Sequence, residues 1–313
     1  MFQGMEYVYE VYKERSFSRA ADKLFVSQPS LSAAVKRVER KVGYPIFDRS
    51  TKPLQLTEFG RRYIQAVEQI LATENDFSNF VNDWGGLKTG TLVLGGSSLF
   101  SSWVLPPLMG EFARRFPLVK LELVEESTAR LETLLRSGAI DLVMDNCELD
   151  QEVFDRHVFR KEYLLLAVPG SFPVNESLKS YQIPAEAIQS QSFLRKEVEA
   201  VPLAVFQKEP FLVLKPENDT RQRAMELCSR CGFQPEILFE LDQQMTSYNI
   251  TCSGMGISFI SDTLAAKVPA TSQVVYYKLE GSGCSRNLYF YWKRGRYFSR
   301  AMQEFLELSV SVK

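Results

Sequence analysis

The chain has 313 residues, of which 45% are hydrophobic and 24% charged. It is therefore too long for one ordinary domain and too apolar to be mainly disordered. Lys and Arg number 37 against 38 Asp and Glu, and this net charge of −1 at first argues against a partner as acidic as DNA.

The charge is unevenly distributed along the chain. Residues 1–62 contain twelve Lys and Arg against seven Asp and Glu, a net charge of +5. The remaining residues contain 25 against 31, a net charge of −6. A basic segment attached to an acidic body is typical of a protein in which one part binds nucleic acid.

Cysteine usage and hydropathy indicate a cytoplasmic protein. The five cysteines are an odd number scattered through a long chain, which favours reduced thiols over a secreted disulfide framework. We find neither an apolar window of about 18 residues nor the features of a signal peptide. The single histidine, His157, excludes chemistry built on several histidines. We expect no catalytic site, no metal site and no cofactor.

The first 43 residues predict three helices. Apolar residues at i, i+3, i+4 and i+7 mark the first helix. Ser16 and Ser27 can cap the second and third helices, and Gly43 is placed to end the third. Small residues on the second helix allow a close crossing with the third, which is typical of a helix-turn-helix. The predicted helices cover residues 5–12, 18–25 and 28–42.

The outward face of the third helix carries side chains that can read DNA. An amide can bind adenine, hydroxyls serve several base edges, and cations reach guanine or phosphate. The following residues 45–57 predict two short strands around a basic turn, a β-wing suited to phosphates or the minor groove. A solvated helix face without a role in DNA binding is the alternative. The candidate contacts are Gln28, Ser30, Ser32, Lys36, Arg37, Arg49 and Lys52.

Residues 57–85 predict one long helix with a heptad-like apolar seam. Spacings of 4-3-4-3-4-3 form when Glu74 is included, which favours a helix that joins two subunits. A helix packed on its own chain is the alternative. Gly85-Gly86 is expected to end this helix and Gly90 to close a hinge. The seam residues are Tyr63, Val67, Ile70, Glu74, Phe77, Val81 and Trp84.

The run SFSRAADKLFVSQPSLSAAVKRVERKVGYPIFDRS at 16–50, followed by LTEFG at 56–60, resembles the winged helix-turn-helix of LysR-type transcriptional regulators. The resemblance implies contacts with double-stranded DNA through the Ser27-Gln28-Pro29 run, Ser32 and the wing, where Arg49 and Lys52 lie nearest phosphate. It also implies a homodimer joined through the long helix, and often a homotetramer.

Residues 91–313 alternate between strands and helices, which predicts a parallel sheet with crossover helices. A second α/β unit follows an irregular stretch at 171–209, so we expect two lobes with a cleft between them. The expected fold is therefore a winged helix-turn-helix followed by a two-lobed α/β effector domain. The expected divisions are 1–58 for DNA binding, 59–87 for the dimerisation helix, 88–163 with 264–313 for lobe I, and 164–263 for lobe II.

Small and hydroxylated residues precede three helices of this body, where ligands of such sheets usually sit. Helix N-termini favour an effector with an anionic group. Ordinary helix capping is the alternative at each place. The candidate effector-binding residues are Ser97, Ser98, Thr128, Asn218, Asp219 and Thr220.

The body is also similar to the LysR-type effector-binding domain, which is itself similar to periplasmic binding proteins. The runs SSWVLPPLMGEFARRFPLVKLELVE, SGAIDLVM and SGMGISFIS carry this resemblance. It implies a small-molecule effector between the lobes, and Ser97, Thr128 and the 218–220 loop match the usual places of contact.

The favoured interpretation is a transcription factor whose DNA binding is controlled by a small molecule. One alternative is a metabolite-binding or enzymatic α/β protein with an appended basic domain. Another is a redox-responsive regulator that uses Cys228 and Cys231, a CxxC pair at the end of a helix. A redox motif would normally lie at a helix start, so packing thiols are favoured there.

Overall fold

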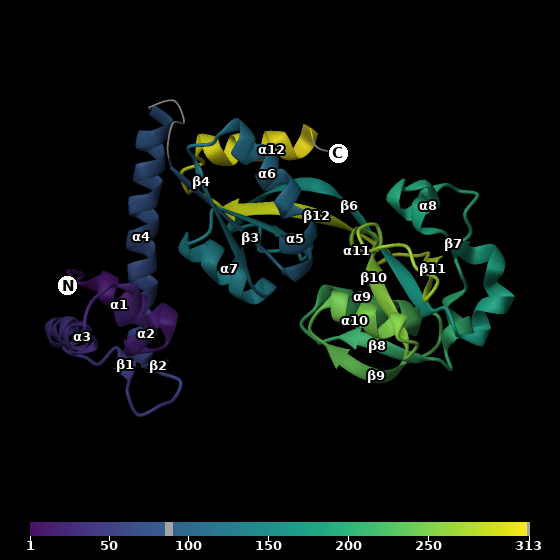
Figure 1. Cartoon of the computed structure of the whole chain (residues 1–313), viewed down its shortest axis with the longest axis horizontal. Coiled ribbons are helices and arrows are strands. Elements are labelled where there is room, and N and C mark those ends of the chain that lie inside the picture. Colours follow the sequence, from purple (N-terminus) through teal and green to yellow (C-terminus); the bar gives the residue numbers. More distant parts are fainter. Residues whose placement is uncertain (85–89, 312–313) are drawn as a thin grey trace.

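The computed structural model describes residues 1–84 and 90–311, which form a small helical head, a long helix and two α/β lobes (Figure 1). The expected helix end at Gly85-Gly86 lies outside these residues. Within the described ranges, every helix is too short or too polar to cross a membrane.

The head has three helices and a two-stranded wing, as the sequence predicted. Ser27 accepts a hydrogen bond from the backbone of Ser30 at the start of the third helix, and Gly43 adopts a left-handed conformation just after its end. The second helix begins one residue before the predicted range and ends two residues before its end. The elements are α1 (Met5–Glu14), α2 (Phe17–Lys23), α3 (Gln28–Val42), β1 (Phe47–Asp48) and β2 (Gln55–Leu56).

The buried faces of the three helices form one apolar core. Close approach of α2 and α3 depends on the small side chains of Ala20 and Ala21, both buried. The first residues of the long helix α4 (Glu58–Trp84) complete this core, so head and helix are packed together. The principal core residues are Val8, Val11, Ala20, Ala21, Leu31, Val35, Val38, Tyr63, Ile64 and Val67.

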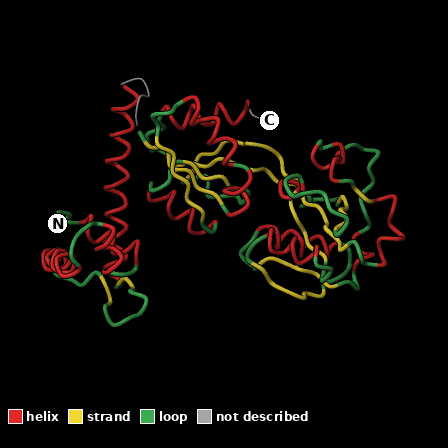
Figure 2. The backbone as a smooth tube through the Cα atoms, viewed as in Figure 1, coloured by secondary structure: helices red, strands yellow, loops and turns green. Residues whose placement is uncertain are grey.

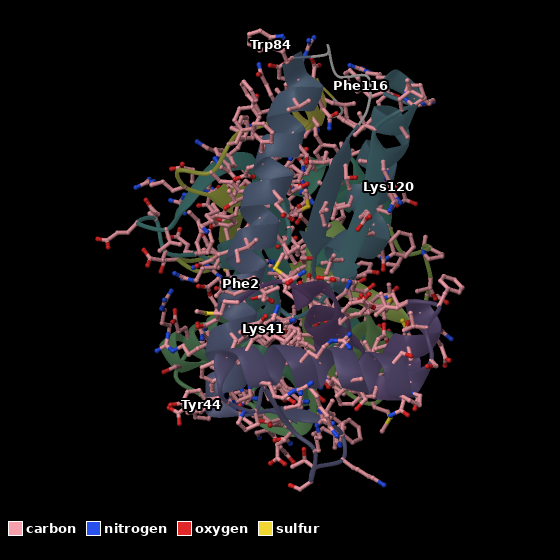
Figure 3. The ribbon with its side chains drawn as sticks, turned by 90° about the vertical axis from the view of Figure 1, so that its left-hand side faces the viewer. Phe2, Lys41, Tyr44, Trp84, Phe116 and Lys120 are labelled. Atoms are coloured by element: carbon pink, nitrogen blue, oxygen red, sulfur yellow. The ribbon has the colours of Figure 1, made fainter. Side chains whose placement is uncertain are left out.

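Helix α4 runs from the head along the side of the first lobe, with Trp84 at its far end (Figures 1 and 3). Tyr63 and Val67 of the predicted seam are buried within their own chain. The later seam residues are open: Phe77 is 67% exposed, Val81 51% and Trp84 85%. The first half of the predicted seam therefore packs on its own chain, whereas the second half is left exposed.

Lobe I is built on a mixed sheet in the order β4-β3-β5-β12-β6. The predicted βαβαβ unit gives parallel pairs between β3 and both β4 and β5, whereas β12 pairs antiparallel with β5 and β6. Its elements are β3 (Thr91–Gly96), α5 (Ser98–Trp103), α6 (Leu105–Arg115), β4 (Lys120–Glu125), α7 (Thr128–Ser137), β5 (Leu142–Asp145), β12 (Ser285–Lys293) and α12 (Arg300–Ser311).

Lobe II surrounds the strand order β6-β10-β8-β9, with β11 and β7 beside β6. The stretch at 171–209 contains short elements that its sequence did not predict: β7 (Gln182–Ile183), α8 (Ala185–Gln189) and the 3₁₀ turns Pro173–Tyr181, Ser192–Leu194 and Leu203–Phe206. The other elements are β8 (Pro210–Leu214), α9 (Asp219–Arg230), β9 (Glu236–Leu241), α10 (Gln244–Cys252), β10 (Ile257–Ser261), α11 (Asp262–Ala265) and β11 (Val274–Lys278).

Strand β6 (Phe154–Pro169) belongs to both lobes (Figure 2). Up to Tyr163 it pairs with β12, and from Leu164 it pairs with β10 and β11. The expected return to lobe I at residue 264 is wrong, because α11 and β11 pack against the lobe II part of β6. The chain returns between Lys278 and Ser285. An apolar strand such as β11 does not reveal from its own sequence which sheet it joins.

Candidate functional site

The exposed face of α3 presents most of the predicted DNA-reading side chains. Pro29, Lys36 and Arg37 are exposed on the side opposite the buried stripe, and Gln28 is exposed in the first turn. Ser30 is exposed too, but its hydroxyl lies 2.7 Å from that of Ser27, and both groups serve the helix cap. The face therefore offers an amide at the helix start and two cations more than two turns later.

Arg49 holds the wing against α3. It donates to the hydroxyl of Ser32 at 3.3 Å, forms a 3.1 Å ion pair with Glu39, and its guanidinium lies 5.0 Å from the ring centre of Phe17. Glu39 also accepts from the backbone N–H of Ile46 at 2.9 Å. Its carboxylate thus fixes the first strand of the wing. Arg49 consequently positions the wing, whereas Lys52 is exposed near the wing tip.

Between the lobes lies a cavity of about 500 Å³. It brings together five of the six residues predicted for effector binding, which come from the starts of α5, α7 and α9. Ser98 is the exception and does not line it. The lining residues from the predicted set are Ser97, Thr128, Asn218, Asp219 and Thr220.

The hydroxyl groups around the cavity have different roles. Ser97 stands at the N-cap of α5, but its side chain makes no capping hydrogen bond. Thr128 donates to the carboxylate of Asp145 at 2.8 Å. Asn218 caps α9 by accepting from the backbone of Thr220 at 2.9 Å. Helix capping therefore accounts for Asn218, whereas the hydroxyl of Ser97 has no such task.

Arg286 on β12 joins the two lobes beneath the cavity, a role that the sequence did not suggest. It forms ion pairs with Glu162 at 2.8 Å and Asp219 at 2.6 Å, and donates to Thr220 at 3.1 Å. Burial alone would raise the pKa of Glu162, but the adjacent Arg286 lowers it, so this carboxylate stays charged. A cation just before the aromatic run of β12 was the only sequence signal.

Asp145 ends strand β5 and lines the cavity. Its carboxylate accepts from the hydroxyl of Thr128 and from the backbone of Cys147. Burial raises the pKa of Asp145. Burial, together with the nearby Asp145, also raises the pKa of the Cys147 thiol to about 12, which keeps that thiol protonated.

The first turn of helix α7 contacts both the cavity and the head. Its first residue, Thr128, lines the cavity, and Arg130 donates to the hydroxyl of Tyr12 on α1 at 3.2 Å. The buried Glu68 of α4 is close by: burial raises its pKa, and the positive charge of Arg130 opposes that rise. One short helix thus contacts the cavity at one end and the head within its first turn.

Two further contacts fasten α4 to lobe I. The buried Arg296 forms ion pairs with Asp76 of α4 and with Asp141, the latter at 2.9 Å. Near the end of α4, Asp83 accepts from the hydroxyl of Tyr297 and the backbone of Arg300, both at 2.8 Å. These contacts place α4 beside lobe I along most of its length (Figure 1).

The two cysteines of the CxxC pair differ in environment. Cys228 is buried in the core of lobe II and Cys231 is exposed. Burial raises the pKa of the Cys228 thiol to about 12, which disfavours the reactive thiolate. Among the described residues, no group of three or more potential ligands could hold a metal ion.

Two family models match the chain. The model described as "Bacterial regulatory helix-turn-helix protein, lysR family" matches residues 2–61. The model described as "LysR substrate binding domain" matches residues 85–312. Together these two matches span nearly the whole chain.

Individual proteins are similar over comparable lengths. An uncharacterized HTH-type transcriptional regulator of Bacillus subtilis (strain 168), YcgK, is 29% identical over 97% of this chain and 92% of its own. Full-length CbnR, solved with its target DNA, aligns with a TM-score of 0.66 at 18% identity over 99% of this chain and 98% of its own. The effector-binding domain of BenM, solved with its effector benzoate, covers 71% of this chain and 91% of its own at 19% identity, with a TM-score of 0.56. At these identities the two structures are evidence for the fold alone.

Proposed function

The chain belongs to the LysR family of transcriptional regulators, effector-controlled proteins that bind DNA, and we propose which of its parts perform each step. Residues 1–58 bind double-stranded DNA, residues 59–87 join two copies, and residues 88–313 hold a small-molecule effector. A regulator of this kind acts where the chromosome is, so we assign it to the cytoplasm, without a cofactor.

The DNA-binding surface is the exposed face of α3 together with the wing. An α-helix fits the major groove, where Gln28 can bind adenine and Arg37 can reach guanine or phosphate. Lys36 and Lys52 serve phosphates, while Pro29 starts the helix next to the DNA. The observation that supports this assignment most strongly is the row of polar side chains on α3 beside a basic wing, on the only strongly basic part of the sequence.

Substitution of Lys36 by Ala tests this surface. Loss of one phosphate contact should weaken binding to all DNA sequences alike and reduce the slope of log K against log salt by about 1. Gln28→Ala should instead reduce the preference for one sequence over another. Lys120→Ala, which removes an exposed cation on lobe I, is the matched control and should leave both quantities unchanged. If Lys36→Ala behaves like this control, the surface is misassigned.

The second half of α4 is the surface that joins two copies. Phe77, Val81 and Trp84 are large, apolar and exposed, and the ring of Phe80 stacks on Phe77 and lies tilted against Trp84. An apolar stripe of this kind on a long helix favours helix pairing. A dimer also allows two α3 helices to read two half-sites on one face of DNA.

The cavity between the lobes is the effector site. It lies beyond the carboxyl ends of β3, β5 and β8, the usual position of ligands in open α/β sheets. The contact of α7 with both the cavity and the head gives the effector a route to the DNA-binding surface. An effector acts by preferring one arrangement of the two. Ser97→Ala should therefore weaken the response to the effector without weakening DNA binding by the effector-free protein.

A further inference from the structure

The charged side chains that line the cavity between the lobes are mainly acidic. Of the charged residues described along its wall, Lys215 is the one cation. Such a wall repels anions and attracts cations, because solvent screens charges less inside a cleft than on an open surface. The carboxylates that line it are Glu126, Glu132, Asp145, Glu148, Glu217, Asp219 and Asp242.

Four of these carboxylates already have protein partners. Glu132 pairs with Arg136, Glu148 with Arg156, and Asp242 with Lys215. Asp219 pairs with both Arg223 and Arg286, and Arg286 also pairs with Glu162 beneath the wall. The cations near the cavity are therefore matched by an equal or larger number of carboxylates.

Three lining carboxylates have no ion pair with any residue that the structure describes: Glu126, Asp145 and Glu217. Glu126 and Glu217 are exposed at the rim, where water solvates them. Asp145 is only 2% exposed, so water cannot replace a missing counter-ion. Its oxygens receive neutral hydrogen bonds from the Thr128 hydroxyl and the Cys147 backbone. A buried carboxylate that faces a cavity without a cation is the clearest indication of what the cavity accepts.

Two of the helix N-termini at this cavity, those of α7 and α9, are already matched by negative groups of the protein. Asp219 lies in the first turn of α9. Asp145 accepts from Thr128 in the first turn of α7. Negative charge at these two positions offsets the positive ends of the helix dipoles, which would otherwise attract an anionic ligand.

We propose that the effector carries a positively charged nitrogen, an ammonium or guanidinium group, that binds Asp145; this proposal rests on the effector site proposed above. Glu126 and Glu217 at the rim attract the same charge. Ser97 follows β3 beside the end of β5, and its hydroxyl, which makes no capping hydrogen bond, can bind a polar or carboxylate group on the rest of the ligand. Simple amines and amino acids share this chemistry.

Calorimetric titration of the full-length protein with paired compounds tests the proposal. The pairs are 1,4-diaminobutane against 1,4-butanediol, and L-lysine against hexanoate, with benzoate as an aromatic carboxylate. Only the nitrogen-bearing member of each pair should bind and raise the melting temperature. Binding by both amines assigns a simple amine, and binding by L-lysine alone assigns an amino acid.

Asp145→Asn keeps the shape of the side chain and removes its charge. It should weaken binding of the amine at least ten-fold, the order expected for one charged hydrogen bond. Glu217→Gln, an exposed substitution that should not affect folding, should weaken binding by a smaller factor. Glu226→Gln, on α9 but outside the cavity, is the matched control and should bind as the wild type does.

The outcomes separate this proposal from the proposed function. If only hexanoate or benzoate binds, and Ser97→Ala weakens that binding, the cavity is an effector site but its ligand class is wrong. Amine binding that is unchanged by both Asp145→Asn and Glu217→Gln also overturns the proposal. If no compound binds, or binding is unchanged by every cavity substitution, the site assignment itself fails together with the proposal.

Discussion

Arg130 on α7 donates a 3.2 Å hydrogen bond to the hydroxyl of Tyr12 on α1, although 118 residues separate the two in the chain. Thr128, which lines the cavity, lies two residues before Arg130 on the same helix. At about 1.5 Å per residue, the two side chains start only about 3 Å apart along the axis. Any movement of α7 at the cavity therefore reaches the head directly.

Substitution of Arg130 by Met should loosen the head while leaving the lobes intact. It removes the hydrogen bond to Tyr12 and leaves the buried Glu68 without the positive charge that opposes the rise in its pKa. Amide hydrogen exchange should become several-fold faster in α1 and the first half of α4, but not in lobe II, because opening free energies are local. Arg136→Met, on the same helix, is the control. An exchange pattern like that of the wild type would contradict the coupling role of α7.

The ion pairs of Arg296 should matter far more than those at the surface. Arg296→Met leaves Asp141, almost completely buried, without its cation, and such a loss typically costs about 3–5 kcal/mol. Calorimetric melting should show a large drop in the melting temperature of lobe I. Arg294→Met breaks an exposed pair with Asp155 and should cost less than about 1 kcal/mol. Equal effects of the two substitutions would argue against a buried pair.

Asp262 should make stability depend on pH. Burial raises its pKa to about 6 from 3.8, although Arg160 lies 3.6 Å away. The folded state therefore binds this proton more tightly than the unfolded state does, so stability falls as pH rises from about 4 to 6 and is constant above. The free energy of unfolding should fall by about 3 kcal/mol in total over this pH range.

Asp262→Asn provides the measurement, because an amide can still accept from the backbone of Tyr163. The difference in unfolding free energy between wild type and variant should favour the variant at pH 7 and vanish near pH 4. Asp242→Asn, at an exposed aspartate, is the comparison. The account of Asp262 is wrong if the difference is the same at both pH values.

The two wing cations should behave differently when removed. Lys52→Ala removes one exposed charge, so the salt slope of DNA binding should fall by about 0.9. Arg49→Met also breaks the contacts with Ser32 and Glu39 that hold the wing on α3. Its loss of affinity should therefore exceed that of Lys52→Ala and persist at high salt, where phosphate contacts are weak. If affinity depends on salt in the same way for both variants, Arg49 does not position the wing.

The head could be predicted almost completely because its signals are local. Ser27 and Gly43 mark the ends of α3 within one residue, and the buried stripe follows the helical period. The sequence predicted the helix starts that line the cavity, but it did not predict the charge of the cavity. Asp145 ends a buried strand of lobe I, and Glu217 lies in a loop of lobe II; only the fold brings these carboxylates to one cavity.

Long-range relationships were beyond prediction for a related reason. The first half of β6 is mostly polar and only partly buried, so only its apolar second half resembled a strand. Likewise, the spacing of the α4 seam is the same whether a residue packs on its own chain, as Val67 does, or is exposed, as Trp84 is. The spacing of apolar residues therefore cannot distinguish a residue that packs on its own chain from one that is exposed.

Selection of DNA by the full-length protein from a random pool, followed by a salt titration on the selected sequence, tests the central claim most directly. We predict enrichment of a site with two related halves, and affinity that falls by at least about ten-fold between 50 and 200 mM salt. Lys36→Ala should lower that salt slope. A protein that enriches no sequence, and whose weak binding is the same at both salt concentrations, would contradict the assignment of α3 and the wing to DNA.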